Sequence, residues 1–241
     1  IVLFVICNYT KIPVRLLQLK VLFMKRYFYT LILLGFTNAV LAQYGRGDYN
    51  HIGLSLGINQ KSLYTDNFNI TPKTSWTGGL AMRGNYYNSF AMVYGMNFTE
   101  NKFSIETNSS SATKEVDLKM MAVQIHLLLS YRIAESAFSI DFGPVLQVNS
   151  ELKFDEADEN NFITDNDLLQ VKDLEKITPI NFNVQVGVTG GFENIRLNLC
   201  YQYGVTNILN NLNDQDEVAF KADGKLKGNL GVFAGNIIFY F

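Results

Sequence analysis

The chain has 241 residues, of which 48% are hydrophobic and 17% are charged. A typical soluble domain carries about a quarter of charged residues, so this chain must bury its apolar side chains or place them against lipid. The composition is rich in Tyr, Phe and Gly and poor in Pro, which favours an all-β fold over a helical bundle.

The start of the chain is basic and lacks acidic residues. The first 42 residues contain basic residues and no acidic residue, which leaves the remainder with an excess of acids. No cluster of Lys and Arg follows Arg26. Because phosphate binding needs a basic face, the sequence argues against a nucleic-acid partner.

Residues 24–42 have the three parts of a secretory signal peptide. Met24-Lys25-Arg26 supplies the positive start, Tyr27 to Phe36 the apolar run, and Val40-Leu41-Ala42 the small-residue site, with cleavage predicted before Gln43. A membrane anchor is the alternative, but the run is shorter than the roughly 20 residues that cross a bilayer. We interpret residues 1–23 as an upstream, non-native extension and residues 43–241 as the mature domain.

Cysteine usage gives no disulfide in that mature domain. The two cysteines are Cys7 and Cys200, and Cys7 lies in the upstream extension. The chain has no CxxC spacing, which excludes a zinc ribbon or a CxxC redox motif.

From residue 51 onward the dominant hydrophobic period is two, which is typical of strands with different environments on their two faces. In His51–Gln60, four aliphatic residues alternate with Gly, Ser and Asn. The same alternation recurs further along the chain. The eight predicted strands are 51–60, 76–83, 90–98, 121–132, 138–143, 180–189, 195–204 and 233–241.

The connections between these strands alternate in length. Short links lie near 85–88, 134–136 and 190–194, whereas long polar segments cover 61–74, 100–115, 150–178 and 207–225. An even strand number places both chain termini on the same side of the membrane as the short turns, which is the periplasmic side. The long loops then face outward. The prediction is an all-β fold: a closed antiparallel transmembrane β-barrel of about eight strands in an up-and-down meander.

The polar strand face decides between lipid and water on the outside. A soluble lipocalin-like barrel also has period two, but its outer face should be rich in Lys and Glu. Here the polar face is mainly Gly, Ser, Thr, Asn and Gln, which suits a narrow barrel interior. The apolar face then contacts lipid, and the sequence predicts an integral protein of the bacterial outer membrane.

Aromatic residues recur at the predicted strand ends, as expected for interfacial girdles, although ordinary β-propensity could also place them there. The chain closes on an alternating strand in which Phe239 and Phe241 share a face. This ending is similar to the assembly signal of outer-membrane barrels, so we expect the barrel assembly machinery to act on it during insertion. The aromatic residues at strand ends are Trp76, Tyr86, Tyr87, Tyr131, Tyr201, Tyr203, Tyr240 and Phe241.

The chain resembles the PorT-like outer-membrane β-barrel domain family. The likeness is carried by the signal peptide, by the hairpin 127–146 with Leu127-Leu128-Leu129-Ser130-Tyr131 and Asp141-Phe142-Gly143-Pro144-Val145-Leu146, and by Tyr201-Gln202-Tyr203-Gly204-Val205-Thr206-Asn207-Ile208. It covers most of residues 43–241. The resemblance implies the barrel architecture and permits a role in protein secretion, which some relatives have.

Charged residues inside the predicted barrel form the main candidate site. Arg83, Arg132 and Arg196 should point inward near the periplasmic end, with Asp141 at the same depth. A buried network of ion pairs and hydrogen bonds is expected there, because unpaired guanidinium groups are costly in a confined interior. It would act as a plug, and an anion or proton path is the functional alternative.

No catalytic, cofactor or metal residue is predicted, and the protein is not expected to be an enzyme. His126 points inward and lacks an identifiable nucleophile and orienting acid, so a hydrogen-bonded interior role is favoured. Two histidines do not suffice for a multi-His zinc centre.

The long segment 151–176 is rich in acids, which raises the question of cation binding. It lacks the glycine turn and the spacing of an EF-hand loop, so a solvated loop is predicted. Asp165 to Lys176 could form a short amphipathic helix through Leu168, Leu169 and Val171, which would cap the barrel or touch a partner. These acids include Asp155, Glu156, Asp158, Glu159, Asp165 and Asp167.

The leading hypothesis is a non-enzymatic membrane protein whose outer loops serve envelope structure, adhesion or partner binding. An accessory component of a protein secretion or transport machine is the second hypothesis, and a soluble periplasmic lipocalin-like carrier is a weaker one. Expected partners are outer-membrane lipid, the assembly machinery and an unidentified protein, and no cofactor is expected.

Overall fold

The computed structural model describes residues 51–241 with the exception of 110–111, 135–136, 165 and 223. The predicted upstream extension, the signal peptide and its cleavage site lie outside the described residues.

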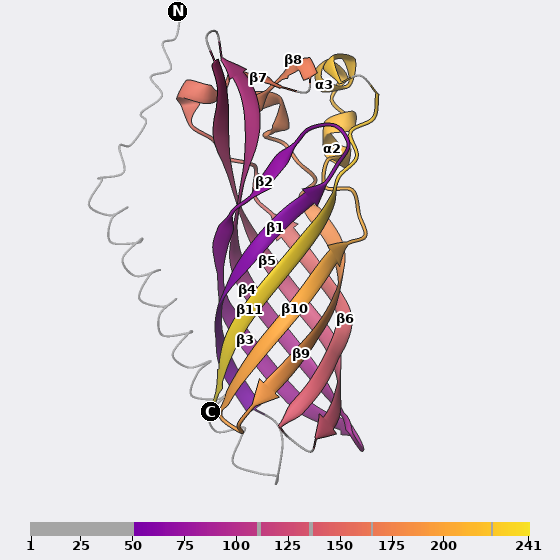
Figure 1. Cartoon of the computed structure of the whole chain (residues 1–241). Coiled ribbons are helices and arrows are strands. Elements are labelled where there is room, and N and C mark those ends of the chain that lie inside the picture. The colour runs from indigo at the N-terminus through magenta and orange to yellow at the C-terminus, as the bar shows by residue number, and fades with distance from the viewer. Residues whose placement is uncertain (1–50, 110–111, 135–136, 165, 223) are drawn as a thin grey trace, which may run out of the picture. The chain divides into compact units, whose positions relative to one another are not determined.

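Eight strands of the described chain close into a ring in which every strand is antiparallel to both neighbours (Figure 1). Barrel strands that are consecutive in sequence are neighbours in the ring, and the last strand pairs with the first. This topology confirms the predicted antiparallel meander barrel. The ring consists of β1 (His51–Tyr64), β3 (Thr74–Tyr87), β4 (Phe90–Ser109), β5 (Ala112–Ala134), β6 (Phe138–Asn149), β9 (Ile180–Gly191), β10 (Ile195–Gly204) and β11 (Asn229–Tyr240).

Burial follows the period of two in the sequence. In β6, exposed and buried residues alternate at every position from Phe138 to Asn149. The outward side chains are large and apolar, and Ile58 keeps 64% of its surface exposed and Phe142 56%. Such a continuous exposed apolar surface does not occur on water-soluble monomers and indicates a lipid contact.

The short turns at one end depend on residues that tolerate a left-handed backbone. Asn88, between β3 and β4, has φ 48°, and Gly191, at the end of β9, has φ 143°. Asn and Gly are the residues that adopt positive φ at least cost. We call this end the periplasmic end, because outer-membrane barrels place their short turns there.

The opposite end differs from the sequence prediction. The expected loop 100–115 is wrong: β4 and β5 continue as a paired hairpin up to Ser109 and Ala112, well beyond the barrel wall (Figure 1). Phe103, Ile105 and Val116 alternate with polar residues and are buried. The polar composition of the segment concealed this second, shorter amphipathic pattern.

Further elements join the hairpin at this end. β2 (Ile70–Pro72) and β7 (Phe162–Ile163) pair with β4, and β8 (Asn166–Gln170) pairs with β7. The remaining elements are η1 (Glu156–Asp158), η2 (Val171–Leu174), α2 (Asn210–Asn213) and α3 (Asp216–Lys221). Among the described residues, no helix has the length and apolar character to cross a membrane.

The predicted amphipathic helix over 165–176 is also wrong, because β8 and the single 3-10 turn η2 occupy it. In this segment Leu168 is exposed while Leu169 is fully buried, which is the alternation of a strand. Pairing with β7 supplies the backbone hydrogen bonds that a helix would have supplied.

Candidate functional site: the filled lumen and the outer cap

The lumen of the barrel is filled by side-chain amides at mid-height. Gln124 Nε2 donates to Gln147 Oε1 at 2.7 Å and is also 3.0 Å from Gln202 Oε1, and Gln202 Nε2 donates to Gln185 Oε1 at 3.1 Å. All four glutamines are buried. The bonds Gln124–Gln147 and Gln202–Gln185 each join neighbouring strands. The Gln124–Gln202 bond joins β5 to β10 through the lumen, past the two strands between them.

His126 lies within this amide layer. Its Nδ1 is 3.0 Å from Gln185 Oε1, and its Nε2 is 3.4 Å from Asn97 Nδ2. The partners assign a neutral ring in which Nδ1–H donates and Nε2 accepts. Both partners are amides, so the structure places His126 in a hydrogen-bonded interior position.

Arg83 and Asp141 lie near the periplasmic end and are linked through Ser139. The Arg83 guanidinium donates to Ser130 Oγ at 2.6 Å and to Ser139 Oγ at 3.0 Å, and Ser139 donates to Asp141 Oδ1 at 3.2 Å. Asp141 also accepts hydrogen bonds from Thr189 and Asn198.

Arginines and the carboxylate do not meet directly. In the described part of the chain, no guanidinium lies within 4.0 Å of Asp141, so the predicted ion pairs are replaced by hydrogen bonds through hydroxyl groups. Arg196 is buried close to Arg83. Arg132 lies at the rim, half-buried, and donates to the carbonyl oxygen of Asn88, so it does not join the buried cluster.

Lys61 is a lumen residue that the sequence analysis missed. It lies on β1 at the outer end of the lumen with 2% of its surface exposed, and its Nζ is 3.5 Å from Gln147 Oε1. The signal was available: Lys61 is in phase with inward Ser55 and Asn59, but the predicted strand ended at Gln60.

The space that remains inside the barrel is small. One cavity of about 50 Å³ is lined by inward residues that include Asn97, His126 and Tyr240. A site for a drug-sized ligand needs several hundred Å³. The described interior therefore has no room for the cargo of a lipocalin-like carrier.

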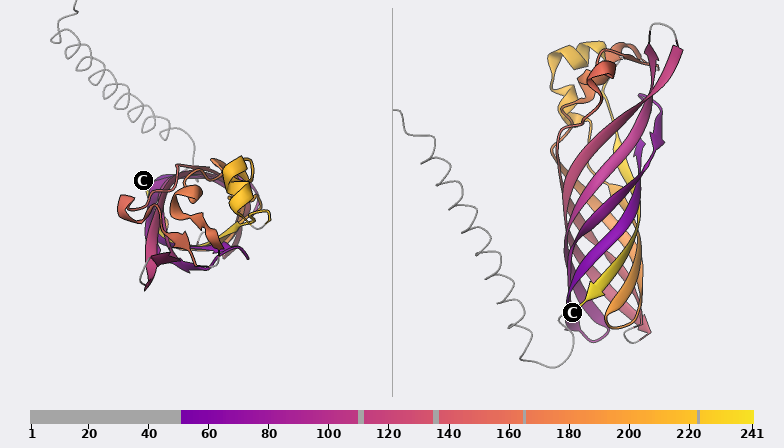
Figure 2. Two further views of the ribbon diagram at one scale, coloured as in Figure 1. Left: turned by 90° about the horizontal axis from the view of Figure 1, so that it is seen from above. Right: turned by 90° about the vertical axis from the view of Figure 1, so that its left-hand side faces the viewer.

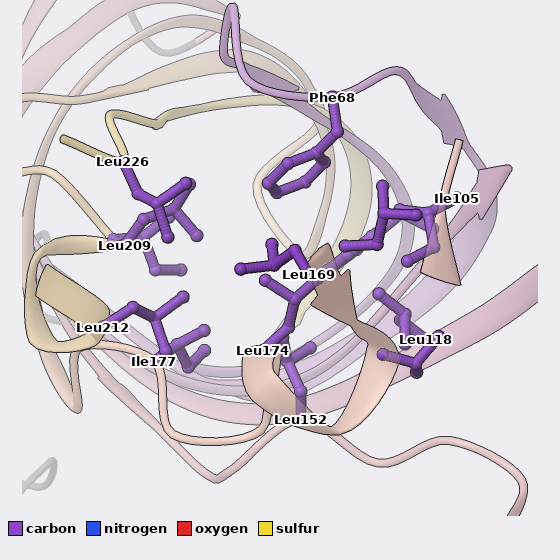
Figure 3. Close-up of a cluster of buried hydrophobic side chains, with 14 of the residues drawn as sticks. Phe68, Ile105, Leu118, Leu152, Leu169, Leu174, Ile177, Leu209, Leu212 and Leu226 are labelled. Atoms are coloured by element: carbon purple, nitrogen blue, oxygen red, sulfur yellow. The ribbon is translucent and has the colours of Figure 1, made fainter. Parts of the chain in front are cut away.

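The long outer connections form a folded cap with its own hydrophobic core. We define the outer cap as residues 65–73, 102–119, 150–179 and 205–228. Seen from above, its segments lie across the barrel opening (Figure 2). Figure 3 shows buried side chains from all four segments pointing toward one another. They include Phe68, Ile105, Leu118, Leu152, Leu169, Leu174, Ile177, Leu209, Leu212 and Leu226.

This core corrects the prediction of a solvated acidic loop at 151–176. The acidic residues of the segment alternate with apolar residues that turn inward, and Leu152, Leu169 and Leu174 are at most 3% exposed. Even Asp158 is largely covered, and its Oδ1 lies 2.6 Å from Lys114 Nζ on the hairpin. Composition concealed the core because acidic residues are as numerous as apolar residues in this segment, and the apolar residues find their partners in distant segments.

Polar contacts fix the segments of the outer cap to one another. Lys221 of α3 lies 2.8 Å from Asp173 of η2, and the Asn207 side chain accepts from the backbone N–H of Leu209 and Gly228. On the hairpin, a 2.5 Å hydrogen bond from Ser104 holds the pKa of Asp117 below its usual range. The contacts of Asp173 and Asn207 bond polar groups that the cap partly covers, whereas Asp117 stays mostly exposed.

The boundary of the apolar band is marked by lysines. On β5 the outward residues are apolar from Tyr131 to Met121, and Lys119 follows. Lys119 lies directly opposite Lys102 on β4, and on its other side it pairs with Lys153 through an isolated β-bridge. Long amphipathic lysines suit the level at which hydrocarbon gives way to polar headgroups. Metal-ligand clusters of three or more His, Cys, Asp or Glu do not occur in the described residues.

An apolar outer band, a polar filled lumen and a closed antiparallel ring define an integral outer-membrane β-barrel. Residues 41–210 match the outer membrane protein beta-barrel domain family, and the chain belongs to this family. Among curated proteins, none matches the chain.

Solved structures of outer-membrane proteins are similar to this chain. Neisserial surface protein A (NspA) is 11% identical, with 81% of this chain and 100% of that chain covered and a TM-score of 0.46. Ail of Yersinia pestis, in complex with the heparin analogue sucrose octasulfate, is 13% identical, with 80% and 99% covered and a TM-score of 0.46. OprG from Pseudomonas aeruginosa is 12% identical, with 80% and 94% covered and a TM-score of 0.36.

Proposed function

We propose that the protein is a non-conducting, non-enzymatic outer-membrane barrel that presents its outer cap to a protein partner at the cell surface. One observation carries the proposal: the outer connections pack into a hydrophobic core over the mouth of a lumen that is already filled by side chains. A barrel of this construction is a rigid support for a surface module.

Conduction is tested first. The amide layer around Gln124 and the cap core both lie across the path of an ion. We expect purified protein in a planar bilayer to give no steady conductance under conditions in which a general porin conducts. A stable open pore in the same preparation would contradict the proposal.

The surface of the outer cap carries apolar side chains suited to a protein contact. Leu168 on β8 is 59% exposed and Phe220 on α3 is 87% exposed, and the two elements contact each other. Interfaces place such residues at their centre, within a polar rim. Here the rim is supplied by acidic and basic residues such as Glu217 and Lys172.

A matched pair of variants tests the partner. Leu168→Ser combined with Phe220→Ser removes the apolar surface, and Phe192→Ser changes an 83% exposed residue at the opposite, periplasmic end. After gentle detergent extraction from the native cells, we expect a stoichiometric partner with wild type and Phe192→Ser, and its loss with the double variant. A lone monomer in all three extracts contradicts partner binding.

We further propose that the chain is PorT-like and that the partner can belong to a secretion or transport machine. Support comes from the resemblance of residues 127–146 and 201–208, which lie on or beside β5, β6 and β10. The identity of the co-purified subunits separates this function from adhesion: envelope machine subunits support it, and host or surface ligands support adhesion.

The end of β11 is proposed to be the assembly signal. Phe239 and Phe241 are 44% and 52% exposed on the outer face, while Tyr240 between them points inward. β11 pairs with β1 to close the ring, so the signal sits on the strand that completes the barrel. Replacing both Phe residues by Ser should reduce insertion in cells, and unchanged insertion would contradict this role.

A further inference from the structure

Three hydrogen-bond donors from three strands lie together near the periplasmic end of the lumen. They are the side chains of Arg83 on β3, Arg196 on β10 and Tyr240 on β11, which are 7%, 6% and 4% exposed. Arg83 lies beside the Tyr240 hydroxyl and is close enough to Arg196 for the two guanidinium groups to repel each other. We call this group the arginine–tyrosine cluster.

By hydrogen-bond geometry, Arg196 Nη1 and the Tyr240 hydroxyl have no partner among the described residues. Arg83 lies next to the Tyr240 hydroxyl but can only donate to its oxygen, so the O–H of Tyr240 stays open as a donor. Buried polar groups in proteins are almost always hydrogen-bonded, and an unbonded guanidinium nitrogen is costly. Arg83, in contrast, is bonded to Ser130 and Ser139. The cluster therefore offers donors that the protein itself leaves open.

The charge in this layer is also unbalanced. Asp141 is the buried carboxylate nearby, and it accepts hydrogen bonds from Ser139, Thr189 and Asn198 instead of from a guanidinium. The guanidinium groups of Arg83 and Arg196 thus share one buried carboxylate, which already accepts hydrogen bonds from three other donors. In a low-dielectric interior, the excess positive charge is unfavourable without an anion.

We propose that the arginine–tyrosine cluster binds one small inorganic anion, a halide or a simple oxoanion, which enters from the periplasm. The lumen cavity is about 50 Å³, and its lining includes Arg83, Tyr240 and the carboxylate Asp141. Arg196 is not part of this lining; it lies opposite Ile238, two residues before Tyr240 on β11. The cavity volume admits a few water molecules or one small ion and excludes a nucleotide, a sugar phosphate or a lipid headgroup. The site is independent of the outer cap and of its proposed partner.

The position of the site gives the anion a structural role. Tyr240 on β11 lies opposite Gly53 on β1, and Gly53 lies opposite Ala81 on β3. Gly53 has no side chain, and a Cβ atom there would be 2.8 Å from the Tyr240 ring. An anion held between Arg83 on β3 and Tyr240 on β11, with the Arg196 charge nearby, bridges the seam where the last strand meets the first.

The experiment uses the full mature barrel refolded in detergent. Thermal unfolding is followed by heat-modifiable gel mobility in sodium chloride and in sodium gluconate of equal ionic strength, because gluconate is too large for the cavity. We expect a saturable rise of Tm with chloride in wild type and in the rim control Arg132→Gln. In Arg196→Gln the apparent chloride affinity should fall about tenfold or more, because a buried positive charge close to the anion is lost.

Two further measurements keep the test decisive. Tyr240→Phe removes the open hydroxyl while keeping the ring, and it should weaken the chloride response if Arg196→Gln does not fold. Crystals of wild type grown in bromide should show an anomalous peak between Arg83, Arg196 and Tyr240. A chloride response that is equal in wild type and variants, or water in place of bromide at the cluster, would overturn the proposal.

Discussion

Leu197 and Asn198 are neighbours on β10 and point to opposite faces of the barrel wall. Leu197 keeps 51% of its surface exposed on the outer face, and Asn198 keeps 6% inside the lumen. Leu197→Arg should lower the free energy of unfolding by about 2–4 kcal/mol, because it places a charge in the hydrocarbon band. Asn198→Ala removes the 2.9 Å contact with Thr189 and should cost about 1 kcal/mol. Urea titration in lipid vesicles measures both values, and equal costs would contradict the assignment of the two faces.

The core of the outer cap should unfold separately from the barrel. Leu212→Ala removes a fully buried side chain and should destabilise the cap by about 2–5 kcal/mol, whereas Leu168→Ala changes an exposed position and should cost under about 0.5 kcal/mol. Hydrogen exchange of residues 205–228 reports the cap, and heat-modifiable mobility reports the barrel. Loss of both signals together in Leu212→Ala would show that cap and barrel are one cooperative unit.

The strands of the wall approach each other so closely at Gly79 that no side chain fits there, whereas Gly95 has room for one. A Cβ at Gly79 would lie 2.0 Å from the Met96 carbonyl oxygen, whereas the nearest atom to a Cβ at Gly95 is 3.5 Å away. Gly79→Ala should therefore reduce the yield of folded barrel strongly, and Gly95→Ala should fold like wild type. The folded fraction on unheated gels compares them directly, with equal yields being the contrary result.

Lys61 should be replaceable by an apolar residue. Its charge is buried, and its 3.5 Å contact with Gln147 is long for a hydrogen bond. Because a buried charge with weak compensation costs desolvation energy, Lys61→Met should leave stability unchanged or raise it. A loss of more than about 2 kcal/mol in urea titration would instead assign Lys61 a strong interaction in the lumen.

Asp117 should give the extended hairpin a mild acid sensitivity. Its pKa is lowered chiefly by the hydrogen bond from Ser104. The ionised side chain therefore stabilises the folded hairpin fully above the pKa that Asp117 has in the unfolded chain, and this stabilisation is lost as the pH falls through the lower pKa of the folded state. With 64% of the side chain exposed, the effect should stay below about 1 kcal/mol. Asp117→Asn should remove this pH dependence of hairpin protection in hydrogen exchange, and an unchanged profile would assign it to another group.

The barrel wall was predictable because its information is local. Each wall strand meets lipid on one face and the lumen on the other, so alternation within a single segment such as 195–204 reveals both. The inward direction of Arg83, Asp141 and His126 follows from the same phase. The partners of these residues did not follow, because Ser130 and Gln185 reach them across the ring from distant strands.

The outer cap was not predictable in the same way. Phe68, Leu174 and Leu209 are far apart in sequence and each sits in a polar segment, so no local period connects them. The extension of the hairpin was not predictable for a related reason. Its inward face, with Ile105 and Leu118, meets protein instead of lipid, so its apolar pattern is short and the segment resembles a polar loop.

Because the cap core takes side chains from every outer connection between barrel strands in the described chain, the loops of this barrel do not behave as independent appendages. Exchanging one loop for that of another protein would strip the remaining three of their apolar partners and expose them to water. Engineering of this surface, for display of a foreign peptide for instance, must therefore transplant the four connections together or use positions such as Phe220 that lie outside their shared interior.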